Sequence, residues 1–322
     1  MADDESDGDC MIFIMGITGS GKSHFINKII ENGAIEQPGL QSGTQHCQLV
    51  KGKLDENTSF ALVDTPGFDD TTRSDGEILE HITRFLVVQH QLGIRLKGII
   101  YLHRITDNRI QGSTLKNFQM FQRLCGNAAF GNVILVTTMW DLLDDQTTGY
   151  QREQELREQF WGLMEDHGSY IDRFDGNPKT AEALVMTLLS KDDVLLNIQV
   201  ELDRGLRLDE TSAGSIVAVS LEEELRDSKK QMERIDESIA GAVRGRNRTT
   251  KKYLERQMQE AKSRFQQYSR VRERLRAKVS EEVAEDIDQK KKSSRSPAAL
   301  TIFMAVLGLC NVVCNILSFV GF

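Results

Sequence analysis

Paired cysteines are missing from this chain. Its 322 residues contain five cysteines, with no C-x-x-C pair and no metal-ligand spacing to the histidines. The five are Cys10, Cys47, Cys125, Cys310 and Cys314. Their spacing favours buried or free reduced thiols over a disulfide framework or a zinc site.

An excess of positive charge is also missing. Lysine and arginine number 40 against 48 aspartates and glutamates, which gives a net charge of -8. A general nucleic-acid binder needs an exposed basic face, so we expect no nucleic-acid partner. The acidic N-terminal tail, residues 1–9, is the reverse of a secretory signal or an arginine-rich transit peptide, and predicts that the folded part of the chain stays in the cytosol.

A phosphate-binding motif stands near the start of the chain. Residues 16–23 read G-I-T-G-S-G-K-S and follow the apolar run 11–15. A strand, a glycine-rich turn and a helix in that order direct backbone N–H groups and the helix dipole at one anion. Lys22 can then reach the β- and γ-phosphates, and the Ser23 hydroxyl can bind Mg²⁺. The motif predicts binding of a nucleoside triphosphate.

The second motif is D-T-P-G at 64–67, at the end of the apolar run 59–63. Asp64 can hold the Mg²⁺ shell, and the Gly67 N–H can approach the γ-phosphate. Together the two motifs favour a switch-type GTPase. The loop 37–45 supplies hydroxyls that could complete the Mg²⁺ shell, and we take Thr44 over Ser42, although an ordinary loop threonine is the alternative.

The base-reading element is expected after the run 133–137, where the sequence continues T-M-W-D. GTPases usually have N/T-K-x-D there, with the aspartate accepting hydrogen bonds from guanine. Asp141 fits that role, while Met139 replaces the lysine and can cover the base by dispersion. Guanine is therefore favoured over adenine. A further base-contacting loop could lie at 173–177.

Catalysis is less well specified than binding. Ras-like enzymes place a water-orienting glutamine after D-x-x-G, whereas this chain has Phe68 followed by Asp69 and Asp70. Hydrolysis is therefore expected to be slow, or to depend on a neighbouring hydroxyl or aspartate, or on a partner. Arg73 and Arg104 are not assigned catalytic roles.

The predicted site combines these assignments. The candidate catalytic residues are Lys22, Thr44 and Gly67, and the candidate Mg²⁺ ligands are Ser23, Thr44 and Asp64. The candidate nucleotide-binding residues are Gly16, Thr18, Gly19, Ser20, Gly21, Lys22, Ser23, His24, Asp64, Gly67, Thr138 and Asp141.

Strand-length and helix-length segments alternate through the first two thirds of the chain. The expected strands are 11–15, 47–51, 59–63, 98–103 and 133–137, and the expected helices are 22–32, 77–91, 113–124, 151–165 and 180–190, the last extending toward 202. This alternation predicts an α/β fold, a mostly parallel sheet in a three-layer αβα G-domain over residues 10–205.

The remaining residues are expected to be helical. After a linker at 206–218, apolar residues in 219–292 recur every three or four positions in two stretches, with glycines at 241 and 245 between them. A helical hairpin is the economical interpretation, and a long dimeric coiled coil is the alternative. The basic run 244–252 is either a solvated loop or a contact for anionic lipid or an acidic partner.

The C-terminal segment 298–322 has no charged side chain and follows a basic and polar flank at 293–297. A transmembrane helix needs ~20 apolar residues, so this segment is predicted to be a tail anchor with its flank in the cytosol. A membrane-surface or self-associating helix is the alternative. The protein is thus expected on the cytosolic face of an intracellular membrane, either endoplasmic reticulum or mitochondrial outer membrane.

The strings G-I-T-G-S-G-K-S, V-D-T-P-G-F-D-D and V-T-T-M-W-D, in this order, resemble septin-like and immunity-associated (GIMAP-type and Toc-receptor-like) P-loop GTPases, with particular similarity to fungal G-domain proteins around residues 101–105 and 137–141. The resemblance covers residues 12–189. It implies binding of GTP or GDP with Mg²⁺, homodimerisation across the nucleotide face in several branches, and C-terminal membrane anchors in several members.

These observations lead to one function and two alternatives. The leading hypothesis is a membrane-tethered, GTP-binding switch or scaffold that hydrolyses GTP slowly. A GTP-dependent membrane-assembly module without hydrolysis is the first alternative, and a P-loop ATPase is the second. Protein effectors are expected, but the sequence does not identify them.

Overall fold

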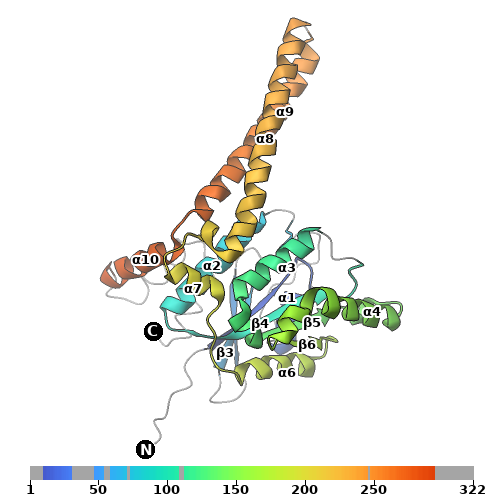
Figure 1. The fold of residues 1–322 in the computed structure, drawn as a ribbon, viewed down its shortest axis with the longest axis vertical. Coiled ribbons are helices and arrows are strands. Elements are labelled where there is room, and N and C mark those ends of the chain that lie inside the picture. The colour runs from blue at the N-terminus through green and yellow to red at the C-terminus, as the bar shows by residue number, and fades with distance from the viewer. Residues whose placement is uncertain are drawn as a thin grey trace, which may run out of the picture.

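The computed structural model describes residues 10–30, 47–53, 59–70, 73–108, 112–245 and 247–293, and a six-stranded sheet forms its centre (Figure 1). The strands are β1 (Cys10–Gly16), β2 (Gln48–Lys53), β3 (Ser59–Asp64), β4 (Arg95–Arg104), β5 (Val133–Thr138) and β6 (Tyr170–Arg173). Their order in the sheet is β2-β3-β1-β4-β5-β6. The β2–β3 pair is antiparallel and the other pairs are parallel. The predicted mostly parallel sheet is therefore confirmed.

Helices cover both faces of this sheet. They are α1 (Lys22–Ile29), α2 (Asp75–Gln91), α3 (Gly112–Cys125), α4 (Gln146–Leu156), α5 (Gly162–Asp166), α6 (Pro178–Leu189), α7 (Asn197–Asp203), α8 (Ser212–Arg244), α9 (Arg248–Leu275) and α10 (Val279–Ser293). Short 3₁₀ segments occupy Asn127–Asn132, Trp140–Leu142 and Leu208–Glu210, and a π-helical segment, Arg157–Trp161, joins α4 to α5.

Strand β1 shows why the core has two halves. Successive side chains of a strand point to opposite faces, so Met11, Phe13 and Met15 join a cluster on the α2 and α3 side of the sheet. Ile12 and Ile14 join a separate cluster with α1 and α6 on the other face. All five side chains are buried. A strand buried on both faces reads as one apolar run, as this one does.

Several elements differ from the sequence-based expectations. β6 was not predicted, because Ile171 is its single buried apolar residue. The helix expected to run from 180 toward 202 divides into α6 and α7. The intervening segment is held by contacts from other elements, including the Lys97–Asp193 ion pair at 2.9 Å. The helix expected from 151 begins earlier, at Gln146, because the Asp145 carboxylate caps it by accepting from the Thr147 and Thr148 N–H groups.

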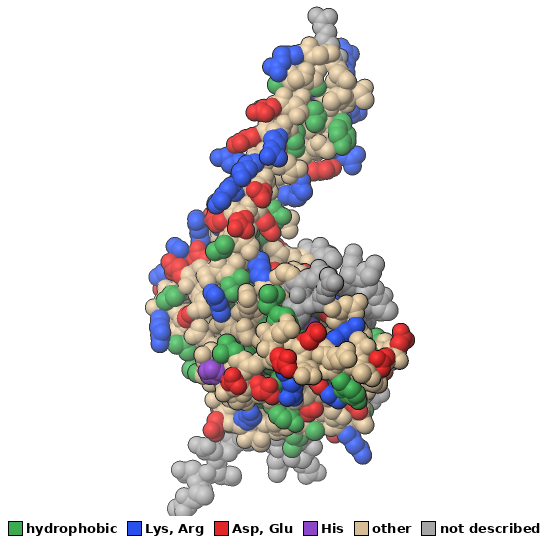
Figure 2. Space-filling model, turned by 45° about the vertical axis from the view of Figure 1, so that its right-hand side comes forward, with side chains coloured by type: hydrophobic (Ala, Val, Ile, Leu, Met, Phe, Trp, Pro, Cys, Tyr) green, Lys and Arg blue, Asp and Glu red, His purple; other side chains and the backbone are tan. Residues whose placement is uncertain are grey.

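The C-terminal helices α8 and α9 lie side by side as a hairpin that projects from the sheet domain (Figure 1). The Asn247 side chain accepts from the Thr250 N–H and caps α9, so the chain reverses between Arg244 and Arg248. Helix α8 begins at Ser212, within the expected linker, because the Thr211 hydroxyl caps it. Figure 2 shows basic and acidic side chains interspersed along the hairpin.

The base of the hairpin packs against the sheet domain. Val217 and Leu221 of α8 and Val271 and Leu275 of α9 belong to the same buried cluster as α2 and α3. The following helix, α10, packs beside α2 and α7. An ion-pair network joins these elements: Arg84 of α2 contacts Glu80 at 2.9 Å and Glu282 of α10 at 2.7 Å, and Arg274 of α9 contacts Glu80 at 3.3 Å. The hairpin base and the sheet domain thus share one core.

Several sequence-based assignments lie outside the described residues, namely the acidic tail 1–9, Thr44, and the apolar segment 298–322. Within the described ranges, none of the helices has the length and apolar character needed to cross a membrane.

Candidate functional site

The phosphate loop connects β1 to α1 at the carboxyl edge of the sheet. A Cβ on Gly16 would lie 2.3 Å from the Leu102 carbonyl oxygen, so only glycine allows β1 to approach β4 there. Gly21 caps α1 with a φ of 91°, a left-handed conformation that glycine adopts without strain. These two constraints bring the N-terminus of α1 to the loop, where the N–H groups of its first turn and its dipole favour an anion.

Lys22 is the first residue of α1 and is buried. Its ammonium donates to the carbonyl oxygens of Gly16 at 3.3 Å and Ile17 at 3.0 Å. Burial lowers the pKa of Lys22 to about 8, and the opposing charge of Asp64 raises it only in part. The phosphate loop thus encloses a lysine ammonium that the nearby carboxylates do not fully neutralise. A negatively charged triphosphate could supply the missing neutralisation.

Ser23 and Asp64 meet at the end of β3. The Ser23 hydroxyl donates to Oδ2 of Asp64 at 2.7 Å, and Asp64 is fully buried. The next residue, Thr65, donates its hydroxyl proton to the Ile14 carbonyl at 2.8 Å and so ties this strand end to β1. A hydroxyl beside a carboxylate is a donor set that Mg²⁺ prefers. The two residues therefore fit the metal role predicted for them.

The segment after Asp64 lies directly on the phosphate loop. The Thr18 N–H donates to the Phe68 carbonyl at 2.9 Å, and the Thr18 hydroxyl donates to the Gly67 carbonyl at 3.2 Å. A Cβ on Gly67 would come within 2.5 Å of the Thr18 nitrogen. Phe68 itself is fully buried in the core. A phosphate bound at this loop would therefore lie close to the Gly67 backbone.

Thr138 joins the phosphate loop to the base-reading segment. Its hydroxyl donates to the Ser20 carbonyl at 3.0 Å, with the His103 carbonyl at 3.3 Å. The sequence predicted a nucleotide-binding role for Thr138, and the structure places it as a link between β5, β4 and the loop. Asp141 is exposed, and Met139 before it has a φ of 62°.

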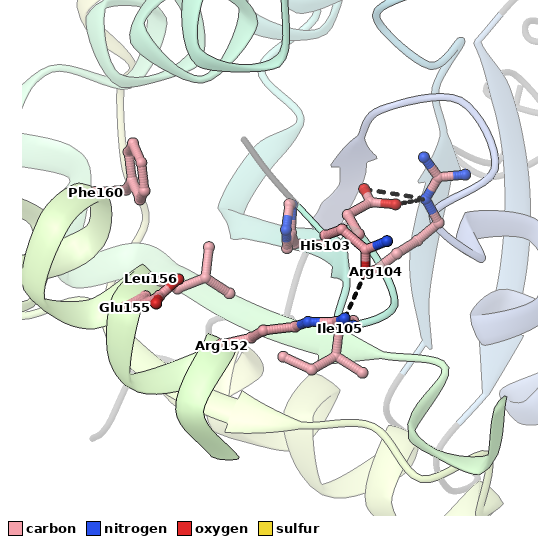
Figure 3. Close-up of a pocket in the computed structure, with 9 residues that line it drawn as sticks. His103, Arg104, Ile105, Arg152, Glu155, Leu156 and Phe160 are labelled. Atoms are coloured by element: carbon pink, nitrogen blue, oxygen red, sulfur yellow. Dashed lines mark hydrogen bonds and ion pairs between the residues drawn. The ribbon is translucent and has the colours of Figure 1, made fainter. Parts of the chain in front are cut away.

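Arg104 lies against the phosphate loop at the end of β4 (Figure 3). A Cβ on Gly19 would lie 3.2 Å from its Nη1 atom, and the Asp107 carboxylate holds its Nε at 3.0 Å. Because Arg104 adds positive charge, it also helps to lower the pKa of Lys22. No catalytic role was assigned to Arg104 from the sequence, because its contact with the loop depends on how β4 and the loop are placed in the sheet.

His103 precedes Arg104 and helps to line a pocket with Leu156 of α4 and Phe160 of the π-helical segment (Figure 3). Its ring lies 6.1 Å from that of Trp161. Burial lowers the pKa of His103 to about 4. His103 is therefore a neutral core residue near pH 7.

The structure brings most of the predicted site residues together at one edge of the sheet. The Thr18 to Ser23 segment, Asp64, Gly67 and Thr138 are joined by the contacts above, and Ser20 is buried. The His24 ring lies 6.2 Å from that of Phe174, which belongs to the predicted further base-contacting loop at 173–177. Sequence reasoning placed Arg173 in a possible base-contacting loop but missed Glu153, which Arg173 contacts behind the base-reading segment.

Similarity to known proteins follows the same segments. The model of the AIG1 family matches residues 10–176, just over half of the chain. Translocase of chloroplast 90 of Arabidopsis thaliana is 29% identical over 138 residues, which make up 42% of this chain and 17% of that much longer protein. The match to the family model includes the phosphate loop, D-T-P-G and T-M-W-D segments.

Two solved structures with a similar arrangement bind guanine nucleotides or an analogue of them. Arabidopsis thaliana Toc33 in complex with Mg²⁺ and GMPPNP is 16% identical, with a TM-score of 0.47 over 58% of this chain and 87% of that one. Era of Aquifex aeolicus bound to GDP and AlF₄⁻ is 16% identical, with a TM-score of 0.42 over 62% of this chain and 64% of that one.

Proposed function

Because the chain belongs to the AIG1 family, we propose that it is a GTP-binding switch or scaffold with slow intrinsic GTP hydrolysis, tethered to a membrane by residues 298–322. The observation that carries the switch is the contact between the phosphate loop and the D-T-P-G segment. Thr18 donates from its N–H to the Phe68 carbonyl and from its hydroxyl to the Gly67 carbonyl, so a γ-phosphate that accepts from these Thr18 donors instead would move the segment leading into α2.

Magnesium fits the pair formed by Ser23 and Asp64. Their oxygens lie 2.7 Å apart beside the loop that would hold the phosphates. When bound, the metal neutralises charge on the β- and γ-phosphates. Thr44 remains the proposed third ligand.

The proposed hydrolysis transfers the γ-phosphoryl group of GTP to water and releases GDP and phosphate. Lys22 and Arg104 supply positive charge beside the phosphate loop. Phe68 is buried and carries no polar atom that could orient water. Asp70, whose charge raises the pKa of Lys22, is our candidate for orienting the water. Hydrolysis that relies on one aspartate in place of a glutamine should be slow.

Single-turnover phosphate release tests the catalytic part of this proposal. The full chain loaded with radiolabelled GTP and Mg²⁺ should release phosphate slowly, and Asp70→Asn should slow it further while leaving GTP affinity unchanged. The buried Phe68 favours a second candidate, a GTP-dependent assembly module without hydrolysis. The absence of any phosphate release by the full chain, at concentrations where it binds GTP, would select that second candidate.

Membrane attachment and self-association are separate parts of the proposal. We expect the cytosolic face of an intracellular membrane, a homodimer across the nucleotide face, and protein effectors. The supporting observation for attachment is the uncharged segment 298–322. Flotation of the full chain with liposomes, compared with a chain ending at 293, tests it, since equal flotation of both would contradict a C-terminal anchor.

A further inference from the structure

Trp140, inside the base-reading segment, is held by a chain of polar contacts. Its side chain is buried, and its indole N–H donates to the Thr137 hydroxyl at 3.0 Å. That hydroxyl donates in turn to Oε1 of Glu153 on α4, at 3.1 Å. Thr137 and Glu153 are themselves buried. The tryptophan between Met139 and Asp141 is therefore connected to α4 by buried groups.

Arg173 completes this cluster from the end of β6. Its Nε lies 3.0 Å from both carboxylate oxygens of Glu153, and its Nη2 also contacts that carboxylate. The guanidinium lies 4.5 Å from the centroid of the Trp140 ring and 4.7 Å from that of Tyr150. Both distances are typical of cation–π contacts. Arg173 thus fixes Glu153 and covers the outer face of Trp140.

The backbone next to Trp140 needs such support. Met139 has a φ of 62°, a left-handed conformation that costs a residue with a Cβ free energy and persists where the surroundings enforce it. The Trp140 carbonyl accepts from the Gln146 side chain at 3.0 Å, and a Cβ on Gly149 would lie 2.7 Å from the Trp140 ring. Trp140 is thus fixed at both its ring and its carbonyl, which determines the direction of the turn at Met139.

We propose that Arg173 is a positioning residue for base recognition, which acts through Glu153 and Trp140 to hold the turn from Thr138 to Asp141. In this chain Met139 stands where related GTPases carry a lysine along the base, so that cation does not orient the segment. The guanidinium of Arg173 orients the segment instead, through its contacts with Glu153 and the Trp140 ring. The inference rests on the proposed binding of GTP through Asp141, and it adds the residues that determine guanine selection.

Competition binding on the full chain tests the proposal. Arg173→Ala should weaken GTP binding about tenfold and change ATP binding little, because only guanine uses Asp141. Arg173→Lys should retain part of the preference, since it keeps a cation over the rings. Arg157→Ala is the matched control, because Arg157 makes an ion pair with Glu165 at 3.1 Å and is 43% exposed against 44% for Arg173. The control should leave both affinities unchanged.

The outcomes separate this inference from the proposed function. An unchanged preference for GTP in Arg173→Ala, or an equal loss for GTP and ATP, would overturn the positioning role alone. Equal affinities of the unmodified chain for GTP and ATP would overturn both guanine selection and the inference.

Tryptophan quenching supplies a readout that does not depend on nucleotide. Arg173→Ala should make Trp140 more accessible to acrylamide, whereas Trp161, the other tryptophan, is 1% exposed and supplies a constant background. Unchanged quenching would contradict the packing of Arg173 over the Trp140 ring.

Discussion

Lys22 is the residue whose chemistry depends most on what the phosphate loop binds. Burial lowers its pKa to about 8, because the folded chain disfavours the charged form. A triphosphate beside the ammonium favours that form and would raise the pKa again. The protonation of Lys22 and the binding of nucleotide are therefore linked.

At pH 9 the lysine is mostly neutral before binding, so GTP binding should take up about one proton per nucleotide. The affinity should be full below pH 8 and fall as the pH rises through the pKa of the bound state. Calorimetry at pH 9 in two buffers of different ionisation enthalpy measures the uptake, and Lys22→Ala should abolish it. Binding without proton uptake at pH 9 would contradict the assignment of Lys22 to the phosphates.

His103 leads to a prediction about folding stability at acid pH. Burial lowers its pKa from an ordinary value near 6.5 to about 4, so between these values the unfolded chain takes up a proton that the folded chain does not. Stability should therefore be lost as the pH falls from 6.5 to 4, by roughly 3 kcal/mol from this residue. Urea unfolding at pH 7 and pH 4.5 should show a smaller loss in His103→Gln. An equal loss in both chains would mean that His103 does not titrate in this way.

The site residues divide by how local their signals are. Lys22, Ser23, Asp64 and Gly67 belong to short motifs whose spacing alone predicts their contacts. Arg104 on β4 contacts the phosphate loop, and Arg173 on β6 contacts Glu153 on α4. Both contacts join residues far apart in the sequence, so no local pattern predicts them. Motif spacing could therefore predict the phosphate end of the site but not the support of the base end.

At the scale of elements, the sheet domain and the hairpin approach each other closely at Gly76 in the first turn of α2. A Cβ there would lie 2.7 Å from Val271 and 3.1 Å from Val217. Both valines are buried, and their branched side chains have little freedom to move. Helix α2 follows the D-T-P-G segment, so this contact lies between the phosphate loop and the hairpin.

We expect Gly76→Ala to destabilise the chain by about 1–3 kcal/mol through overpacking, although alanine favours helix. Combining it with Val271→Ala should recover part of that loss, since the second change removes the colliding methyl groups. A double-mutant cycle of urea unfolding energies measures the coupling. If the losses of unfolding free energy in the two single variants add up in the double variant, residues 76 and 271 are not in steric contact.

The elements missed from the sequence share a physical cause. β6 has four residues at the sheet edge, and pairing with β5 stabilises it more than its own apolar pattern does. The break between α6 and α7 depends on contacts such as that of the Asn132 amide with the Asp192 carbonyl at 2.8 Å. Long amphipathic elements such as α8 and α9 were predictable because their period is local. Short elements stabilised by distant partners were not.

At the scale of the whole molecule, the core crosses the boundary expected at residue 205. Leu208, Ala213, Leu225, Val283 and Ile287 all belong to the cluster beneath α2 and α3. The distal half of the hairpin adds little to that cluster. The sheet domain should therefore need the hairpin base but not the hairpin tip.

Two truncations test this. A chain whose hairpin is shortened by replacing residues 232–261 with a short glycine linker should fold and bind GTP like the full chain. A chain ending at 205 should lose several kcal/mol, because it exposes apolar surface on α2 and α3. Thermal unfolding and GTP binding of both chains give the comparison. Equal stability of the chain ending at 205 and the full chain would show that the two regions fold independently.

The central claim is that this molecule is a guanine-nucleotide switch whose phosphate loop, D-T-P-G segment and Asp141 act as one site. Displacement of a fluorescent GDP analogue from the full chain, with Mg²⁺ present, tests it most directly. GTP should displace the analogue at far lower concentration than ATP, and Asp141→Asn should remove most of that difference. Equal displacement by GTP and ATP would contradict the claim.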